Sequence, residues 1–166
     1  MRRLLTLAAI VVAAVLLETT VLAGVEVAGV RPDVLVLVVV AVAMASGPTA
    51  GAAFGFTTGL VADLLVGLPV GVSALVYTAV GFAVGMARVY VTSPRPVVHL
   101  ALAAAASLAS TWSAGLLLRV FDLSSWALLA RAGPLVAGCN LLLAPFVYPV
   151  VRGLLARVPA QPVEHW

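Results

Sequence analysis

The stretch from Gly51 to Gly71, GAAFGFTTGLVADLLVGLPVG, has a glycine or an aspartate at every fourth position. On a helix, residues four apart lie on one face, and each step falls about 40° past a full turn, so these small residues form a winding groove. Lipid gives helices little hydrophobic reason to associate, and close backbone approach at small residues supplies the attraction instead. The stretch therefore predicts a helix inside a membrane that packs tightly against a neighbouring helix.

The composition of the whole chain also indicates a membrane protein. Of its 166 residues, 64% are apolar and 9% are charged, and the mean hydropathy is +1.22. Because a bilayer core of about 30 Å needs about 20 apolar residues per helix, the chain has room for roughly five or six spans and for no separate soluble domain. The apolar runs are long and uninterrupted, unlike the alternating strands of a membrane barrel. The sequence predicts an all-α polytopic membrane protein.

Turns that contain glycine and proline divide the apolar runs. Gly47-Pro48 separates the second run from the third, because a proline suits the first turn of the helix that follows. If this pair only kinked one long span, there would be five helices and the C-terminus would lie on the other side of the membrane. The favoured prediction is a single domain, residues 1–166, with six transmembrane helices at about residues 4–22, 34–45, 49–66, 72–89, 97–118 and 135–155.

Two segments have more than one interpretation. The first span could be a signal peptide, since Val21-Leu22-Ala23 resembles a cleavage site, but its length and Glu18 near its end favour a retained span. The connector at 119–134 mixes arginine, aspartate and tryptophan, a composition that suits a segment lying in the membrane interface.

All nine basic residues are arginine. If the N-terminus is inside, six lie on the cytoplasmic side and three on the outer side. By the positive-inside rule both termini are then cytoplasmic. Because this charge sits at the edges of the spans, it does not indicate a nucleic-acid-binding surface. The six are Arg2, Arg3, Arg88, Arg95, Arg152 and Arg157, and the three are Arg31, Arg119 and Arg131.

Glycine spacing recurs in the fourth span, at Gly81 and Gly85. Together with Gly51, Gly55 and Gly59, these residues are candidates for close helix contact. Two interpretations stay open: a tight pair of helices within the bundle, which is favoured, or a face that binds a partner protein.

Asp63 continues the glycine stripe one turn beyond Gly59. A carboxylate that faces hydrocarbon costs a few kcal/mol, so Asp63 should face the bundle interior, a polar partner or the outer interface. It could accept hydrogen bonds from the backbone of the turn that leads to Gly71. This structural role is favoured, and contact with a ligand, a proton or a partner is the alternative.

Three further polar residues belong to the spans or their ends. Glu18 falls near the outer end of the first span, and Asp33 precedes the second span, where an aspartate caps exposed amides and complements the helix dipole. Asn140 lies within the sixth span, so its amide needs a partner on another helix or on the backbone. The available polar groups are those of Tyr77, Ser107, Ser110 and Thr111.

Nothing in the sequence indicates catalysis. His99 and His165 are far apart, no spacing typical of metal ligands occurs, and no serine lies in a nucleophile elbow. The single Cys139 can form neither an intramolecular disulfide nor a cysteine metal site. We expect a protein that is not an enzyme and that needs no cofactor or metal.

Residues 31–85, RPDVLVLVVVAVAMASGPTAGAAFGFTTGLVADLLVGLPVGVSALVYTAVGFAVG, resemble the rod-shape-determining MreD family. The matching features are a Pro-Asp start to the second span, a Gly-Pro break, a GF-xx-G-xxx-D-L run and a PxG turn. The last span, NLLLAPFVYPVVRGL, resembles the asparagine-then-proline ending of the family.

This resemblance implies a small scaffold subunit of the bacterial elongation machinery in the cytoplasmic (inner) membrane, where it would help to regulate peptidoglycan synthesis. The implied partners are the lipid bilayer, MreC and, through MreC, the filament MreB and the synthase RodA with its transpeptidase. MreD is also similar in fold to the S component of energy-coupling-factor transporters. The alternative function is therefore that of a vitamin-binding transporter subunit.

Overall fold

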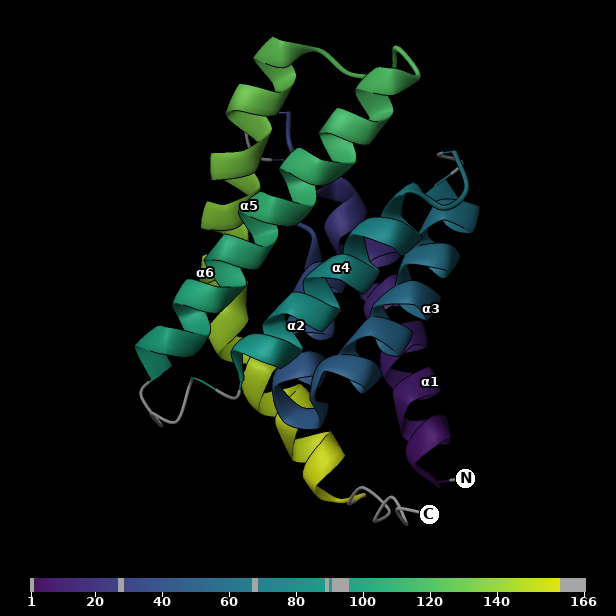
Figure 1. Ribbon diagram of the computed structural model, residues 1–166, viewed down its shortest axis with the longest axis vertical. Helices are drawn as coiled ribbons and strands as arrows, with labels where there is room; N and C mark the ends of the chain where they lie inside the picture. Colours follow the sequence, from purple (N-terminus) through teal and green to yellow (C-terminus); the bar gives the residue numbers. More distant parts are fainter. Residues whose placement is uncertain (1, 27–28, 67–68, 89, 91–95, 159–166) are drawn as a thin grey trace.

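The computed structural model describes residues 2–26, 29–66, 69–88, 90 and 96–158, and the elements in these residues are all helical (Figure 1). A π-helical turn, Leu17–Val21, and a 3₁₀ turn, Leu22–Gly24, extend the first helix. The predicted all-α class is confirmed. The α-helices are α1 (Arg2–Leu16), α2 (Val34–Ser46), α3 (Pro48–Val66), α4 (Val72–Ala87), α5 (Pro96–Val120) and α6 (Trp126–Ala156).

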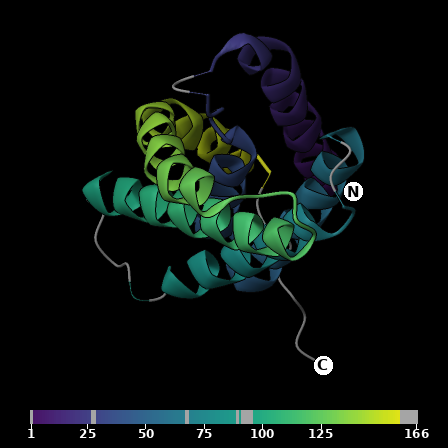
Figure 2. The same ribbon diagram turned by 90° about the horizontal axis from the view of Figure 1, so that it is seen from above.

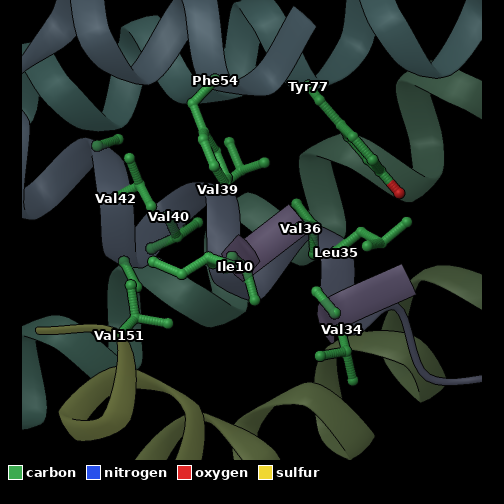
Figure 3. Packing of buried hydrophobic residues seen from close by; sticks show 14 of the residues in the cluster. Ile10, Val34, Leu35, Val36, Val39, Val40, Val42, Phe54, Tyr77 and Val151 are labelled. Carbon is green, nitrogen blue, oxygen red and sulfur yellow. The ribbon is translucent and has the colours of Figure 1, made fainter. Parts of the chain in front are cut away.

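Helix α2 is the centre of the bundle. It is apolar on every side, the pattern of a helix that is surrounded by protein, and each residue from Val34 to Met44 is buried. It contacts the other five α-helices and lies among them when the molecule is seen from above (Figure 2). Figure 3 shows the α2 valines packed with side chains of the surrounding helices. These partners are Ile10, Phe54, Tyr77 and Val151.

The break between α2 and α3 is made by Gly47. Its φ of 92° is a conformation that side chains with a Cβ rarely adopt, and its N–H donates to the Ala43 carbonyl at 2.8 Å to close α2. Pro48 then begins α3. The described residues therefore contain two separate helices here, rather than one kinked helix.

One end of the bundle gathers the start of α1 and the ends of α2, α4 and α6. Arg3 Nη2 donates to Ser46 Oγ at 2.8 Å, and Arg88 Nη1 donates to the Ala45 carbonyl at 3.0 Å. Cations at the carbonyl end of a helix complement its dipole. In Figure 1, α1 begins and α6 ends at this same end. We call it the basic end, defined by Arg2, Arg3, Arg88 and Arg152.

Within the described part of the chain, three segments are long and apolar enough to cross a bilayer: Arg2–Val21, Val97–Val120 and Leu129–Ala156. Two further helices, α2 and α4, are apolar but shorter. At 1.5 Å per residue the 13 residues of α2 rise about 20 Å, less than the roughly 30 Å of a hydrocarbon core. The protein is thus a helical membrane protein in which a short buried helix, α2, is surrounded by the other α-helices of the described residues.

The sixth helix begins at Trp126 and not at about Leu135, so residues 126–134, predicted as part of a connector, are helical. These first turns of α6 are held against α5. Trp112 Nε1 donates to the Leu129 carbonyl at 3.2 Å, and a Cβ at Gly133 would lie 2.2 Å from that same nitrogen. The turn between the two helices is therefore confined to residues 121–125, where Asp122 has a φ of 56°.

Candidate functional site

The glycine seam is the contact between α3 and α4 made by Gly51, Gly55, Gly59, Gly81 and Gly85. A Cβ at Gly55 would lie 2.2 Å from the Tyr77 carbonyl oxygen, and one at Gly59 would lie 2.4 Å from the Ser73 carbonyl oxygen. Such distances are far below van der Waals contact, so no side chain fits between the two backbones.

The same closeness extends to the basic end of the seam. A Cβ at Gly51 would lie 2.5 Å from the Gly81 carbonyl oxygen, and one at Gly81 would lie 2.3 Å from that of Gly51. Gly85 faces the start of α3, where a Cβ would lie 2.4 Å from Pro48 Cα. All five glycines therefore face the inside of the bundle in this structure.

Asp63 is fully buried at the end of α3 and caps the start of α4. Its Oδ2 accepts from Gly71 N at 2.8 Å and from Ala74 N at 3.3 Å, and its Oδ1 accepts from Ser73 N at 3.0 Å. The first N–H groups of a helix have no partner within it, and an anion there also complements the helix dipole. The carboxylate thus joins α3 to α4 at the far end of the glycine seam.

Asp33 caps α2 in a similar way. Its Oδ1 accepts from Val36 N at 3.0 Å. The Tyr77 hydroxyl of α4 points into this group and lies 2.9 Å from Oδ1 and 2.8 Å from Oδ2. The start of the central helix is therefore tied to α4.

Asn140 of α6 binds the backbone of the same Asp33. Its Oδ1 accepts from Asp33 N at 3.1 Å, and its Nδ2 donates to the Asp33 carbonyl at 2.9 Å and to Ser107 Oγ of α5 at 2.8 Å. Ser107 Oγ in turn donates to the Ala103 carbonyl at 2.8 Å. One fully buried amide therefore connects α2, α5 and α6.

Glu18 joins this group from the extension of α1. Its Oε2 accepts from Leu35 N at 3.1 Å, beside the amide that Asp33 caps. We call Glu18, Asp33, Tyr77, Ser107 and Asn140 the polar cluster. It brings three of the four polar residues singled out in the sequence to the start of α2, whereas Asp63 holds the start of α4.

The polar cluster connects helices through hydrogen bonds. Its oxygens and amide face backbone groups and one another, and the residues that the structure describes contain no group of three His, Cys, Asp or Glu side chains that could hold a metal. Thr58 of α3 lies outside the polar cluster, and its buried Oγ1 has no hydrogen-bond partner in the structure. The polar cluster can fix the relative positions of five helices, and it offers no nucleophile aligned with a base.

Two residues have specific partners that sequence reasoning could not assign. Tyr77 and Ser107 were only candidates among several hydroxyls for pairing with Asn140. The structure pairs Ser107 with Asn140 and pairs Tyr77 with Asp33 instead. Their signal in the sequence is a hydroxyl in an otherwise apolar run, which shows that a partner is needed but does not say which.

The fold and the site define the class: a small helical membrane protein whose buried polar side chains join its helices. The family model described as rod shape-determining protein MreD matches residues 1–158. The chain therefore belongs to the MreD family, and the resemblance seen in residues 31–85 is confirmed. No curated protein and no solved structure matches the chain significantly.

Proposed function

We propose that the protein is a non-catalytic scaffold subunit of the bacterial cell-wall elongation complex that binds MreC. Through MreC it would act with MreB and with RodA and its transpeptidase, and so help to regulate peptidoglycan synthesis. Membership of a rod shape-determining family supports this role. The observation that carries the proposal is the use of the buried polar groups: Glu18, Asp33 and Asn140 bind helix ends and one another, as expected of a rigid platform.

We further propose a six-span arrangement in the cytoplasmic membrane with both termini in the cytoplasm, in which the short α2 is enclosed by the other helices. The gathering of arginines at the basic end supports this orientation through the positive-inside rule. Reporter domains fused after Gly47 and after Arg157 should both report the cytoplasm. A periplasmic signal after Arg157 would contradict the six-helix arrangement.

The rival function is that of a vitamin-binding transporter subunit. A site for a polar vitamin needs a cavity lined by several convergent polar groups. The cleft between α2, α5 and α6, about 310 Å³ in volume, is lined mainly by apolar side chains, and the polar cluster does not border it. A wider cleft between α1 and α3, about 1000 Å³ in volume, is also lined mainly by apolar side chains. These features favour the scaffold role.

Affinity purification from membranes separates the two functions. The tagged full chain, extracted in a mild detergent, should recover MreC. A matched purification with an unrelated six-helix membrane protein controls for nonspecific recovery. If the tagged chain recovers the ATPase subunits of a transporter and no MreC, the scaffold proposal is wrong and the rival takes its place.

A further inference from the structure

A cleft of about 310 Å³ opens between α2, α5 and α6 toward the basic end, away from the polar cluster. Its floor is apolar and buried, with Leu37 from α2, Ala103 from α5 and Ala144 from α6. Its remaining wall includes Pro145 and Pro149, which are exposed at the surface of the bundle. The cleft is therefore accessible from the side that faces lipid.

The polar side chains of the cleft lie together at one end of it. They are His99 of α5 and Tyr148 and Arg152 of α6. The rings of His99 and Tyr148 are 4.7 Å apart. Arg152 follows Tyr148 by four residues on α6, so the two side chains lie on the same face of that helix. This end of the cleft thus carries positive charge and aromatic polar groups, whereas the other end carries none.

The position of these groups along the helices matches the edge of a bilayer. His99 follows the start of α5 at Pro96 by one turn, and Arg152 precedes the end of α6 at Ala156 by one turn. Ala144 lies eight residues before Arg152, about 12 Å deeper at 1.5 Å per residue. A molecule in this cleft would meet cationic and hydroxyl groups at the interface and hydrocarbon walls below it.

We propose that this cleft binds one anionic phospholipid of the leaflet at the basic end. The phosphate lies at Arg152 and the Tyr148 hydroxyl, because a guanidinium forms charge-assisted hydrogen bonds with phosphate oxygens. One acyl chain lies along Leu37, Ala103 and Ala144. A zwitterionic lipid carries the same phosphate, but its choline cation is repelled by Arg152, and a free anion lacks the acyl chain. The proposal concerns the described residues of α2, α5 and α6 and does not depend on the scaffold role.

The test is lipid retention by the purified full chain, measured by native mass spectrometry after mixing with phosphatidylglycerol or phosphatidylcholine. Phosphatidylglycerol should be retained preferentially. A hydrogen bond to a charged group contributes about 1.5–3 kcal/mol, which is tenfold or more in affinity, so Arg152→Gln should weaken phosphatidylglycerol binding by at least about tenfold. Arg157→Gln, the same charge change one turn beyond on an exposed side chain outside the cleft, is the matched control and should change binding little.

Two further measurements test which parts of the lipid the cleft recognises. Tyr148→Phe should weaken phosphatidylglycerol binding, because the phosphate loses one hydrogen-bond donor. Inorganic phosphate should compete poorly, because it lacks the acyl chain. Equal losses in Arg152→Gln and Arg157→Gln, equal retention of the two lipids, or competition by inorganic phosphate as strong as that by phosphatidylglycerol would each overturn the proposal.

Discussion

The Tyr77 hydroxyl lies 2.9 and 2.8 Å from the two carboxylate oxygens of Asp33, although the two residues are 44 positions apart. This contact joins the cap of the central helix to α4. The Asp33 carboxylate caps α2 by accepting a hydrogen bond from Val36 N of the same helix. Within the described residues, the Tyr77 hydroxyl links this carboxylate to a second helix. Tyr77 therefore helps to hold the Asp33 carboxylate in its capping position.

Tyr77→Phe should destabilise the bundle. The change removes a hydrogen bond to a charged group and leaves the cap under-satisfied in a buried place, which lowers the free energy of unfolding by about 1.5–3 kcal/mol. Unfolding of the purified chain in mixed micelles, followed by circular dichroism, measures this loss. Tyr90→Phe is the matched control, because Tyr90 is 82% exposed. Equal stability of the two variants would contradict the assigned role.

Asn140 and Ser107 should be energetically coupled. Their side chains are 2.8 Å apart across α5 and α6, and hydrogen bonds between membrane helices contribute about 0.6 kcal/mol on average, up to about 1.7. A double-mutant cycle with Asn140→Ala and Ser107→Ala should return a coupling in this range.

The matched cycle pairs Asn140→Ala with Ser110→Ala. Ser110 Oγ donates to the Ser107 carbonyl of its own helix, so its coupling to Asn140 should be close to zero. A coupling no larger for Ser107 than for Ser110 would show that the α5–α6 bond adds no stability.

Sequence reasoning located the polar residues better than it paired them. Asp63 and Gly71 are separated by one short turn, so a bond between them could be expected from local chain geometry alone. Asp33 and Asn140 are 107 positions apart, and several hydroxyls offered equally good chemistry for the amide. Only the packing of the helices selects between such partners.

The start of α6 is a second feature that sequence reasoning did not predict. The arginine, aspartate and tryptophan residues of segment 119–134 suggested a connector before a last span that begins at about Leu135. In the structure Gly133 is where the Trp112 ring packs, and the helix continues through Pro134. The helix therefore begins earlier than its composition suggested, and its first turns are held by contact with α5, which local composition does not reveal.

Gly55→Ala tests the closeness of α3 and α4. A single methyl group at Gly55 would lie 2.2 Å from the Tyr77 carbonyl oxygen, so the backbones must separate. Overpacking of this kind costs about 1–3 kcal/mol, and Gly55→Leu should cost more and fail to accumulate in membranes. The measurements are membrane accumulation and the free energy of unfolding.

Gly153→Ala is the control for this substitution. Gly153 lies within α6 and a Cβ there meets no atom within 4 Å. The change should be neutral or slightly stabilising, because alanine favours a helix over glycine by about 0.5–1 kcal/mol. If Gly55→Ala is equally well tolerated, then the glycine seam is not a tight backbone contact.

Asp63→Asn should lower stability and leave MreC, the proposed partner, bound. The carboxylate accepts three backbone N–H groups, whereas an amide has one acceptor oxygen and must turn its NH₂ toward at least one of those donors. Loss of a buried hydrogen bond costs about 1–3 kcal/mol, and the favourable charge at the helix start is lost as well. The measurements are the free energy of unfolding and recovery of MreC by affinity purification.

Glu26→Gln gives the matched removal of one negative charge, since Glu26 pairs with Arg31 at 2.7 Å on the exposed surface, where such pairs contribute little. We expect it to match the wild type in both measurements. Asp63→Asn should unfold more easily and still recover MreC in proportion to the folded protein. The opposite result, a variant as stable as the wild type that no longer recovers MreC, would mean that Asp63 contacts the partner and that its role as a cap is secondary.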